Sequence, residues 1–361
     1  MRAVRQPRKP PLPAPLPAGA RLGAFEVRGV LGLGEYGYGY RVWDPESEEE
    51  YAVKEYLPLG LAQREGERAV RPLRPEDEEA YTQGLRVFLD EGKLLSQLRH
   101  PGLVHVYGSW EENGTAYMAM RLVAGRNLQQ TMQARGRPPR EPALRALLQA
   151  LLDALGVLHR AGIEHRDIGL STIVIGPDHR PVLMDLGSPR RLASARGQAA
   201  VTGSREGFAP REMYEGGRNE KHGPWTDIYA LGAVLYCLMT GKPPAPARLR
   251  SEADDALPWP APIRQRYAPE LRALVQWMLS PRPQDRPQDL AAVHAALAAA
   301  AGLPARLRPG RRDRLAVALL RHRRALRWLL VLLALLVLAA LAFGGWRLHG
   351  LGLLPGMTRV E

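Results

Sequence analysis

The chain has 361 residues, of which 45% are hydrophobic and 24% charged, and its single cysteine is Cys237. This length supports one large domain or two ordinary ones, and the composition excludes a wholly disordered or collagen-like chain. A lone cysteine excludes a disulfide scaffold and a cysteine-rich zinc module, and it fits a reducing compartment. The net charge of +13 lies at the two ends, because residues 1–10 and 306–361 are strongly basic while residues 11–305 are neutral overall. A nucleic-acid-binding domain would carry its basic stripe on the fold itself, so we expect no nucleic-acid partner.

The first twenty residues hold six prolines and no apolar run. Proline at this density favours an extended, solvated chain, so we expect residues 1–20 to form a disordered tail. The same prolines could instead dock into an aromatic-lined groove of a partner protein.

The body of the chain changes character along its length. Apolar runs of strand length, separated by glycine, proline or acidic turn residues, dominate residues 24–123. A helical pattern interrupts them at about residues 76–98, and helical patterns prevail from residue 142 onward. A strand-rich part followed by a helix-rich part predicts an α+β fold with two lobes, which we place at residues 21–122 and 123–298.

The pattern of residues in the last part of the chain predicts a membrane anchor. Residues 328–346 carry no charge and are bounded by a tryptophan at each end. As a helix they would span about 28 Å, close to the hydrocarbon thickness of a bilayer. Nine arginines in the basic juxtamembrane segment 299–327 outnumber the two in residues 347–361, so we expect the lobes in the cytoplasm and a short external tail. The arginines of residues 299–327 would also bind anionic lipid headgroups. The alternative to a membrane span at residues 328–346 is a helix buried in a protein core.

A glycine-rich stretch opens the first lobe and reads Gly32-Leu-Gly34-Glu-Tyr-Gly37-Tyr-Gly39. Glycines bring backbone N–H groups against phosphate oxygens, although a plain glycine-rich hairpin has the same pattern. About twenty residues on, where a dinucleotide-binding fold would carry an acidic residue, Lys54 lies in a strand-like run. A lysine that enters from a strand beneath a glycine loop suits the α- and β-phosphates of a nucleotide.

Two carboxylates flank a short predicted hairpin in the second lobe. Asp167 ends the triplet His165-Arg166-Asp167, and Asp185 is followed by Leu186 and Gly187. Carboxylates at the two ends of a hairpin can meet at one site, where one orients a hydroxyl proton and the other holds Mg²⁺. Taken alone, the triplet would be read as a surface turn.

Together these motifs follow the order of the protein kinase signature set, which continues with a helical glutamate, Ala209-Pro-Arg-Glu212, Asp227 and Arg286. The chain resembles the eukaryotic-type Ser/Thr protein kinases over about residues 24–298, and in particular their bacterial membrane-anchored branch. The resemblance implies a bilobal protein-kinase-like fold with a small β-rich N-lobe and a larger helical C-lobe, in addition to the C-terminal transmembrane helix. It implies ATP with Mg²⁺, or Mn²⁺ in its place, and a single-pass protein of the bacterial inner membrane with the kinase domain in the cytoplasm.

The resemblance also implies which residues bind the nucleotide. The glycine loop would cover the phosphates, and the backbone that follows the gatekeeper methionine would meet adenine. The implied binding residues are Gly32, Gly34, Gly37, Lys54, Met120, Val123 and Thr172.

For catalysis, the resemblance implies Asp167 as the base and an ion pair between Lys54 and Glu91, which lies ten residues before Pro101 as it does in the family. The implied metal ligands are Asp185 and Thr172.

Further matching residues would support the site from outside it. Glu212 and Arg286 would form a buried ion pair, and Asp227 would brace the backbone of the catalytic loop, residues 165–172. Arg166 would read a phosphate on the activation segment, residues 188–208. The candidate phosphate acceptors in that segment are Ser188, Ser194, Thr202 and Ser204.

Three positions depart from the family pattern. Gly169 stands in place of a lysine that neutralises the transferring phosphoryl group. Thr172 stands in place of an asparagine that holds a second Mg²⁺ and bonds the loop, and we expect that hydrogen bond to the loop to be lost. Losing one such charge partner costs about 2.7–4 kcal/mol in the transition state, or ~10²–10³ in rate. Gly39 replaces a branched residue that packs on adenine. Two functions therefore stay open: a Ser/Thr protein kinase acting on protein hydroxyls, and a pseudokinase that binds nucleotide weakly or not at all and serves as a signalling scaffold for a partner that the sequence does not identify.

Overall fold

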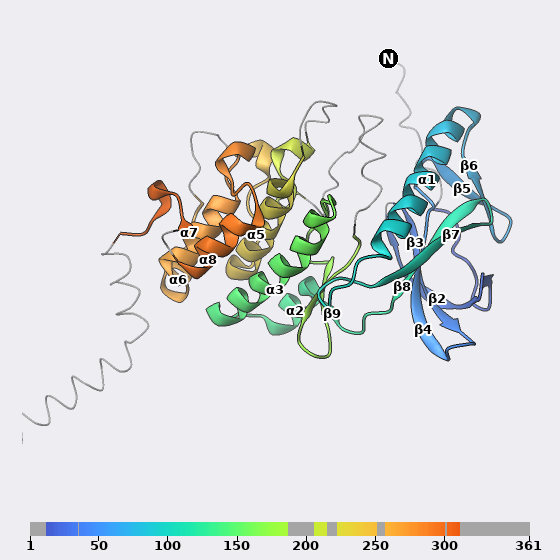
Figure 1. Cartoon of the computed structure of the whole chain (residues 1–361), viewed down its shortest axis with the longest axis horizontal. Helices are drawn as coiled ribbons and strands as arrows, with labels where there is room; N and C mark the ends of the chain where they lie inside the picture. Colours follow the sequence, from blue (N-terminus) through green and yellow to red (C-terminus); the bar gives the residue numbers. More distant parts are fainter. Residues whose placement is uncertain are drawn as a thin grey trace, which may run out of the picture.

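The computed structural model describes residues 12–34, 36–186, 206–214, 222–250, 257–299 and 302–310. These residues form a strand-rich lobe and a helical lobe side by side (Figure 1). The predicted α+β bilobal architecture is therefore confirmed. Among the described residues no helix is long and apolar enough to cross a membrane, and the predicted span at 328–346 lies outside them.

A six-stranded antiparallel sheet forms the core of the small lobe, in the order β1-β2-β3-β4-β8-β7. Strand β8 is buried along nearly its whole length, because it lies between β4 and β7 and a helix packs across it. The strands are β1 (Arg21–Leu22), β2 (Phe25–Gly34), β3 (Gly37–Asp44), β4 (Glu49–Glu55), β7 (Val106–Glu112) and β8 (Thr115–Arg121).

One helix, α1 (Glu78–Leu95), packs across β7 and β8 after a short 3₁₀ turn, η1 (Pro75–Asp77). Its apolar side chains recur at helical spacing, and Tyr81, Phe88 and Leu95 are buried against the sheet. The helix predicted at about residues 76–98 is confirmed, with its ends shifted by two to three residues.

Residues 12–20 differ from their prediction as a solvated tail. Leu16 is only 2% exposed, and its backbone N–H donates to the Tyr40 hydroxyl at 3.1 Å. The Tyr38 hydroxyl donates to the carbonyl of Pro13 at 2.6 Å. The chain is extended here, as its prolines require, but it lies on the small lobe because tyrosine hydroxyls satisfy its backbone groups.

A second hairpin, β5 (Ala62–Glu65) and β6 (Ala69–Pro72), fills the stretch between β4 and α1. It lies at the outer side of the small lobe, away from the helical lobe (Figure 1).

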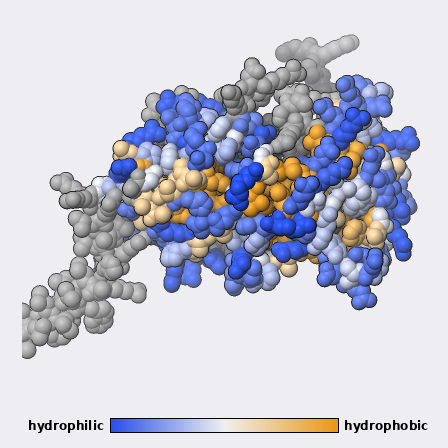
Figure 2. Space-filling view, in the orientation of Figure 1, coloured by the Kyte–Doolittle hydropathy of each residue, from blue (hydrophilic) through white to orange (hydrophobic). Residues whose placement is uncertain are grey.

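The large lobe is built around α5 (Pro224–Thr240), in which every residue from Thr226 to Met239 is buried. Helix α3 (Glu141–Arg160) and helix α7 (Pro269–Met278) pack against it. The other helices and short 3₁₀ turns are α2 (Leu128–Arg135), η3 (Arg211–Met213), η4 (Ala247–Leu249), α6 (Ala261–Arg266), η5 (Pro283–Asp285), α8 (Leu290–Ala298) and η7 (Ala305–Leu307). Apolar residues gather in a band across the middle of the face seen in Figure 2, with hydrophilic residues on either side.

A small antiparallel sheet joins the start of the large lobe to its hairpin. Strand β10 (Ile173–Ile175) lies between β9 (Arg126–Asn127) and β11 (Pro181–Leu183). The hairpin predicted between the two carboxylates is therefore confirmed.

Candidate active site

The glycine loop is the turn between β2 and β3, and its glycines serve two purposes. A Cβ on Gly37, whose φ is +132°, would overlap the carbonyl oxygen of Glu55, so only glycine lets this turn dock on β4. A Cβ on Gly32 would meet open space, and one on Gly34 only the Gly37 carbonyl at 3.7 Å. The loop is thus anchored at its base and leaves room beside Gly32 and Gly34 for an anion to approach the backbone.

Gly39 lies opposite Lys54 in the ladder between β3 and β4. The nearest atom to a Cβ at this position would be Leu31 Cβ, at 3.8 Å. The space that a branched side chain would fill in the family is therefore open here, as the sequence predicts.

Lys54 and Asp185 meet across the two lobes. Lys54 Nζ lies 3.4 Å from Asp185 Oδ1, although the two residues are 131 positions apart in the sequence. The Lys54 side chain is 21% exposed and the Asp185 side chain 47%, so both charges remain partly accessible to solvent. Asp185 has a φ of +55°, an uncommon conformation for a residue with a side chain, and such strain clusters at functional sites.

Glu91 lies on α1, half-buried, beside Gly92 at the contact with the sheet. A Cβ on Gly92 would come within 2.5 Å of Ser109, which shows how closely this turn of α1 approaches β7. The ion pair that Lys54 makes in this structure is with Asp185, and the Lys54–Glu91 pair stays a prediction.

Met120 and Val123 lie where the chain passes from the small lobe to the large one. Met120 is buried near the end of β8, opposite Ala52 of β4. Val123 is half-buried just beyond the strand. Both positions agree with a segment that connects the two lobes, and their contact with adenine stays a prediction.

Asp227, which is fully buried at the start of α5, holds the catalytic loop. Its two carboxylate oxygens accept the backbone N–H groups of His165 and Arg166, at 2.8 and 2.7 Å. His159 Nε2 donates to the same carboxylate at 2.9 Å. The predicted bracing role of Asp227 is confirmed, whereas the contribution of His159 was not predicted, because nothing in its local sequence separates it from a helix-terminal surface histidine.

The His165 ring ties the catalytic loop to the strand that carries Asp185. His165 Nε2 lies 2.8 Å from the carbonyl oxygen of Met184, and the backbone N–H of Asp167 donates to His165 Nδ1 at 3.2 Å. The first contact requires Nε2 to carry the proton and the second requires Nδ1 to accept, so both describe one neutral tautomer. One buried ring therefore sets the position of Asp167 relative to Asp185.

Thr172 makes hydrogen bonds to the backbone of the catalytic loop, as the asparagine of the family pattern would. Its hydroxyl is 3.0 Å from the Asp167 carbonyl and 3.2 Å from the Gly169 carbonyl, and it accepts the Gly169 N–H at 2.9 Å. The expectation that the loop bond is lost is therefore wrong. Because the single hydroxyl proton is donated within the loop, Thr172 offers a metal ion no more than a remaining lone pair.

Arg166 precedes Asp167, the predicted catalytic base, and its guanidinium forms an ion pair with a residue close by in the sequence. Its guanidinium is 2.8 Å from Glu164, a partner that sequence reasoning missed. Burial, followed by the charge of Arg166, lowers the pKa of the nearby His222 below its usual value. The activation segment that Arg166 was expected to read lies almost wholly outside the described residues, and the four candidate acceptors all lie outside them.

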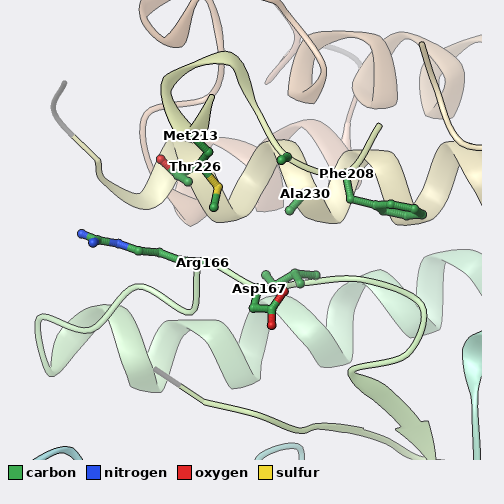
Figure 3. A pocket seen from close by; sticks show the side chains of 8 residues that line it. Arg166, Asp167, Phe208, Met213, Thr226 and Ala230 are labelled. Carbon is green, nitrogen blue, oxygen red and sulfur yellow. The ribbon is translucent and has the colours of Figure 1, made fainter. Parts of the chain in front are cut away.

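A cavity of about 350 Å³ opens beside Asp167. Its walls come from the catalytic loop, from α2, from the end of α5 and from Phe208. A second, smaller pocket lies next to this cavity and shares Asp167, Ile168 and Phe208 with it. Figure 3 shows this smaller pocket, in which the Arg166 and Asp167 side chains leave the loop in different directions, with Phe208 and Ala230 across from them. Apart from Asp167 itself, the described residues that line the 350 Å³ cavity are uncharged, and they include Gln129 and Gln133. A protein hydroxyl could reach Asp167 through this cavity.

The predicted ion pair behind the site is confirmed. Arg286 donates to both carboxylate oxygens of Glu212, at 2.7 and 3.1 Å, and both side chains are fully buried. Arg286 also bonds the carbonyls of Ser280 and Pro281 and lies 4.7 Å above the Tyr229 ring. The pair fastens the segment after the activation loop to the core of the large lobe.

Comparison with known proteins agrees with this geometry. The model of the family described as "Protein kinase domain" matches residues 25–298. The serine/threonine-protein kinase PknB of Mycobacterium leprae is 30% identical over an alignment of 223 residues, which covers 58% of this chain and 35% of that protein. PknL of Mycobacterium tuberculosis, of the same description, is 29% identical over 228 residues, or 61% of this chain and 55% of that protein. The chain thus matches about a third to a half of the length of these relatives.

Solved structures give the same result for the fold. A structure titled "PpkA-294 apo form" is 37% identical, with a TM-score of 0.69 over 78% of this chain and 99% of that one. The kinase domain of Mycobacterium tuberculosis PknI shares the fold at a TM-score of 0.57 and 21% identity. From the family match together with the Lys54–Asp185 contact and the braced catalytic loop, we conclude that this chain belongs to the protein kinase family.

Proposed function

We propose that this chain is a Ser/Thr protein kinase, which transfers the γ-phosphate of ATP to hydroxyl groups of proteins. The observation that carries the proposal is the meeting of Lys54 and Asp185 across the two lobes, at 3.4 Å, beside a catalytic loop fixed by His165 and Asp227. The relatives named as serine/threonine-protein kinases support the choice of acceptor.

The donor set suits a metal ion that arrives with the nucleotide. Among the described residues there is no group of three or more His, Cys, Asp or Glu side chains that could hold an ion by themselves. Mg²⁺ is commonly bound through one or two carboxylates together with substrate phosphates, and Asp185 presents a half-exposed carboxylate to the cleft. Asp185 would hold the ion, which would neutralise charge on the phosphates, while Lys54 binds the α- and β-phosphates. Mn²⁺ has the same preference for oxygen ligands.

Asp167 would act on the acceptor. Its carboxylate accepts the hydrogen of the serine or threonine hydroxyl that enters from the 350 Å³ cavity. The acceptor oxygen then forms a bond to the γ-phosphorus, and the bond from that phosphorus to the β–γ bridging oxygen breaks, so that ADP leaves. Little covalent chemistry falls to the protein, and positioning accounts for most of the acceleration.

The pseudokinase alternative rests on Gly169, Thr172 and Gly39, and the hydrogen bonds of Thr172 weaken the part of it that depends on Thr172. Thr172 keeps the catalytic loop closed by hydrogen bonds to Asp167 and Gly169, so the loop retains its support without the asparagine. Gly169 still lacks the cation of the family lysine, which we expect to slow transfer rather than to abolish it.

We further propose that residues 328–346 anchor the protein in the bacterial inner membrane, with residues 299–327 on the cytoplasmic side and 347–361 outside. The uncharged length and the arginine asymmetry of the sequence support this topology. The test is a reporter enzyme fused after Glu361. We expect the reporter to be located outside the cytoplasm, and a reporter that is located in the cytoplasm would overturn the proposal.

The acceptor class is tested with the 361-residue chain in detergent, ATP and Mg²⁺, and three pools of peptides whose acceptor is serine, threonine or tyrosine. We expect phosphate on the serine and threonine pools. Labelling confined to the tyrosine pool would contradict the acceptor assignment, and no labelling of any pool with either Mg²⁺ or Mn²⁺ would favour the scaffold function.

A further inference from the structure

The outer face of the small-lobe sheet holds a buried polar cluster that the phosphotransfer chemistry does not use. Glu55 follows Lys54 on β4 and is fully buried. Its carboxylate lies 2.6 Å from the guanidinium of Arg64, which comes from the β5–β6 hairpin, and the Arg64 side chain is 2% exposed. The hydroxyls of Tyr40 and Tyr117 donate to the same carboxylate at 2.9 and 3.0 Å. The buried Glu55 carboxylate is therefore both paired with a cation and hydrogen-bonded. Such a satisfied polar network favours one arrangement of the strands that contribute side chains to it.

The same cluster holds residues 12–20, which we call the strap. Arg64 Nε donates to the carbonyl of Ala14 at 2.8 Å, and Tyr40 accepts the backbone N–H of Leu16 at 3.1 Å. A third anchor is the Tyr38 hydroxyl on Pro13. Prolines at every second position pre-set the extended backbone of the strap, so ordering it loses little conformational entropy. The strap is therefore a built-in ligand of the small lobe.

The cluster adjoins both elements that face the nucleotide. On β3, Tyr38 and Tyr40 alternate with Gly37 and Gly39 of the glycine loop, so the tyrosines point to the strap while the glycines line the cleft side. On β4, Lys54 pairs with Gly39 and precedes Glu55.

The base of the glycine loop also rests on Glu55 through the backbone. A side chain at Gly37 would overlap the Glu55 carbonyl, and the backbone N–H of Leu57 donates to the carbonyl of Tyr36 at 2.8 Å. A shift of Glu55 would therefore move the turn that covers the phosphates.

We propose that Arg64 is a positioning residue for nucleotide binding: through Glu55 and Tyr40 it fixes the glycine loop and Lys54, and it does so by clamping the strap of residues 12–20 onto the outer face of the sheet. The expected change in KM for ATP rests on the proposed kinase function, whereas the expected change in hydrogen exchange at the glycine loop does not. The β5–β6 hairpin between β4 and α1 thus acts on the nucleotide-binding residues from the opposite face of the sheet.

The test compares Arg64→Met with Arg71→Met in the 361-residue chain. Both arginines lie on the β5–β6 hairpin and both pair with a glutamate, but the Arg71–Glu65 pair is 71% and 60% exposed at its two side chains. Arg71→Met is therefore a matched control for loss of an arginine from this hairpin. Tyr38→Phe removes one strap anchor and leaves the Glu55–Arg64 pair in place, so it serves if Arg64→Met fails to fold.

Hydrogen exchange of backbone amides at residues 30–40 and the affinity for ATP with Mg²⁺ are the two readouts. In Arg64→Met we expect exchange about 10-fold faster and KM for ATP raised about 5–10-fold with a smaller change in kcat, because ground-state positioning of the nucleotide is lost. Tyr38→Phe should show the same directions at about 3-fold, and Arg71→Met should match the unmodified chain.

A merely structural role would lower the melting temperature of Arg64→Met while its folded fraction kept an unchanged KM and unchanged exchange at the glycine loop. That result, or unchanged exchange in Tyr38→Phe, would overturn the proposal. Failure of the unmodified chain to transfer phosphate would count against the proposed function alone, since hydrogen exchange needs no turnover.

Discussion

At the scale of single residues, Thr172 in the catalytic loop keeps one of the two roles of the asparagine that the family pattern has at this position. An asparagine at position 172 would offer an amide oxygen to a metal ion and a further hydrogen bond to the loop. Thr172 supplies the loop bonds through its hydroxyl but has no second oxygen to present. The missing lysine at position 169 has no such replacement, because glycine brings no charge.

We predict that Gly169→Lys raises the phosphotransfer rate by about 10²-fold, since the new ammonium group would stabilise charge on the transferring phosphoryl group. The site tolerates the change, because a Cβ at Gly169 would meet open space and its φ lies outside the left-handed region. Single-turnover transfer from ATP measures the effect, with Gly169→Met as a control for side-chain length. An equal gain in both variants would show that charge is not what this position lacks.

The Glu212–Arg286 pair leads to a prediction about stability. Removing one partner of a fully buried ion pair leaves the other charge uncompensated, which costs about 3–5 kcal/mol. We therefore expect Arg286→Met to lower the free energy of unfolding of the large lobe by that amount in urea titration. Arg282→Met is the matched control, because Arg282 pairs with Asp285 at the surface and such pairs contribute about 0–1 kcal/mol. Similar losses in the two variants would contradict the assigned role of the buried pair.

At the scale of elements, the sequence was informative where local pattern decides the structure. The strand runs, the helix near residues 76–98 and the hairpin between Asp167 and Asp185 could all be predicted, because apolar periodicity and turn residues specify them locally. The strap at residues 12–20 could not. Its prolines correctly indicate an extended backbone, but its partners, Tyr38, Tyr40 and Arg64, lie far away in the sequence and carry no mark of the contact.

The close packing of α1 against the sheet leads to a prediction at the scale of elements. Gly92→Ala places a methyl group 2.5 Å from Ser109, and overpacking of this kind costs about 1–3 kcal/mol. Alanine gains at most about 1 kcal/mol in helix propensity, so the net effect should be destabilising. Because Glu91 is the adjacent residue, we also expect slower phosphotransfer, whereas Gln83→Ala on the exposed face of α1 should leave the rate unchanged. Faster or equal transfer in Gly92→Ala would show that the position of α1 does not matter to the site.

At the scale of the whole molecule, the candidate site exists only where two lobes of different architecture meet. Lys54 comes from the sheet and Asp185 from the end of the small hairpin in the helical lobe, and Asp167 is held to that hairpin by the His165 ring. The sequence identified these residues through their order, but order alone does not indicate how near they lie. The distribution of charge adds that the two-lobed body is neutral overall and that the basic excess lies in the flanking segments.

The measurement that tests the central claim most directly is the intact mass of the 361-residue chain after incubation with ATP and Mg²⁺. It should be run in parallel on Asp167→Asn and on Asp178→Asn, which alters an exposed carboxylate in the turn of the same hairpin. We predict added masses of one or more phosphoryl groups in the unmodified chain and in Asp178→Asn, and a loss of about 10²-fold or more in their rate of appearance in Asp167→Asn. Equal phosphorylation of all three proteins, or none in any of them, would contradict the account of this cleft as the active site of a kinase.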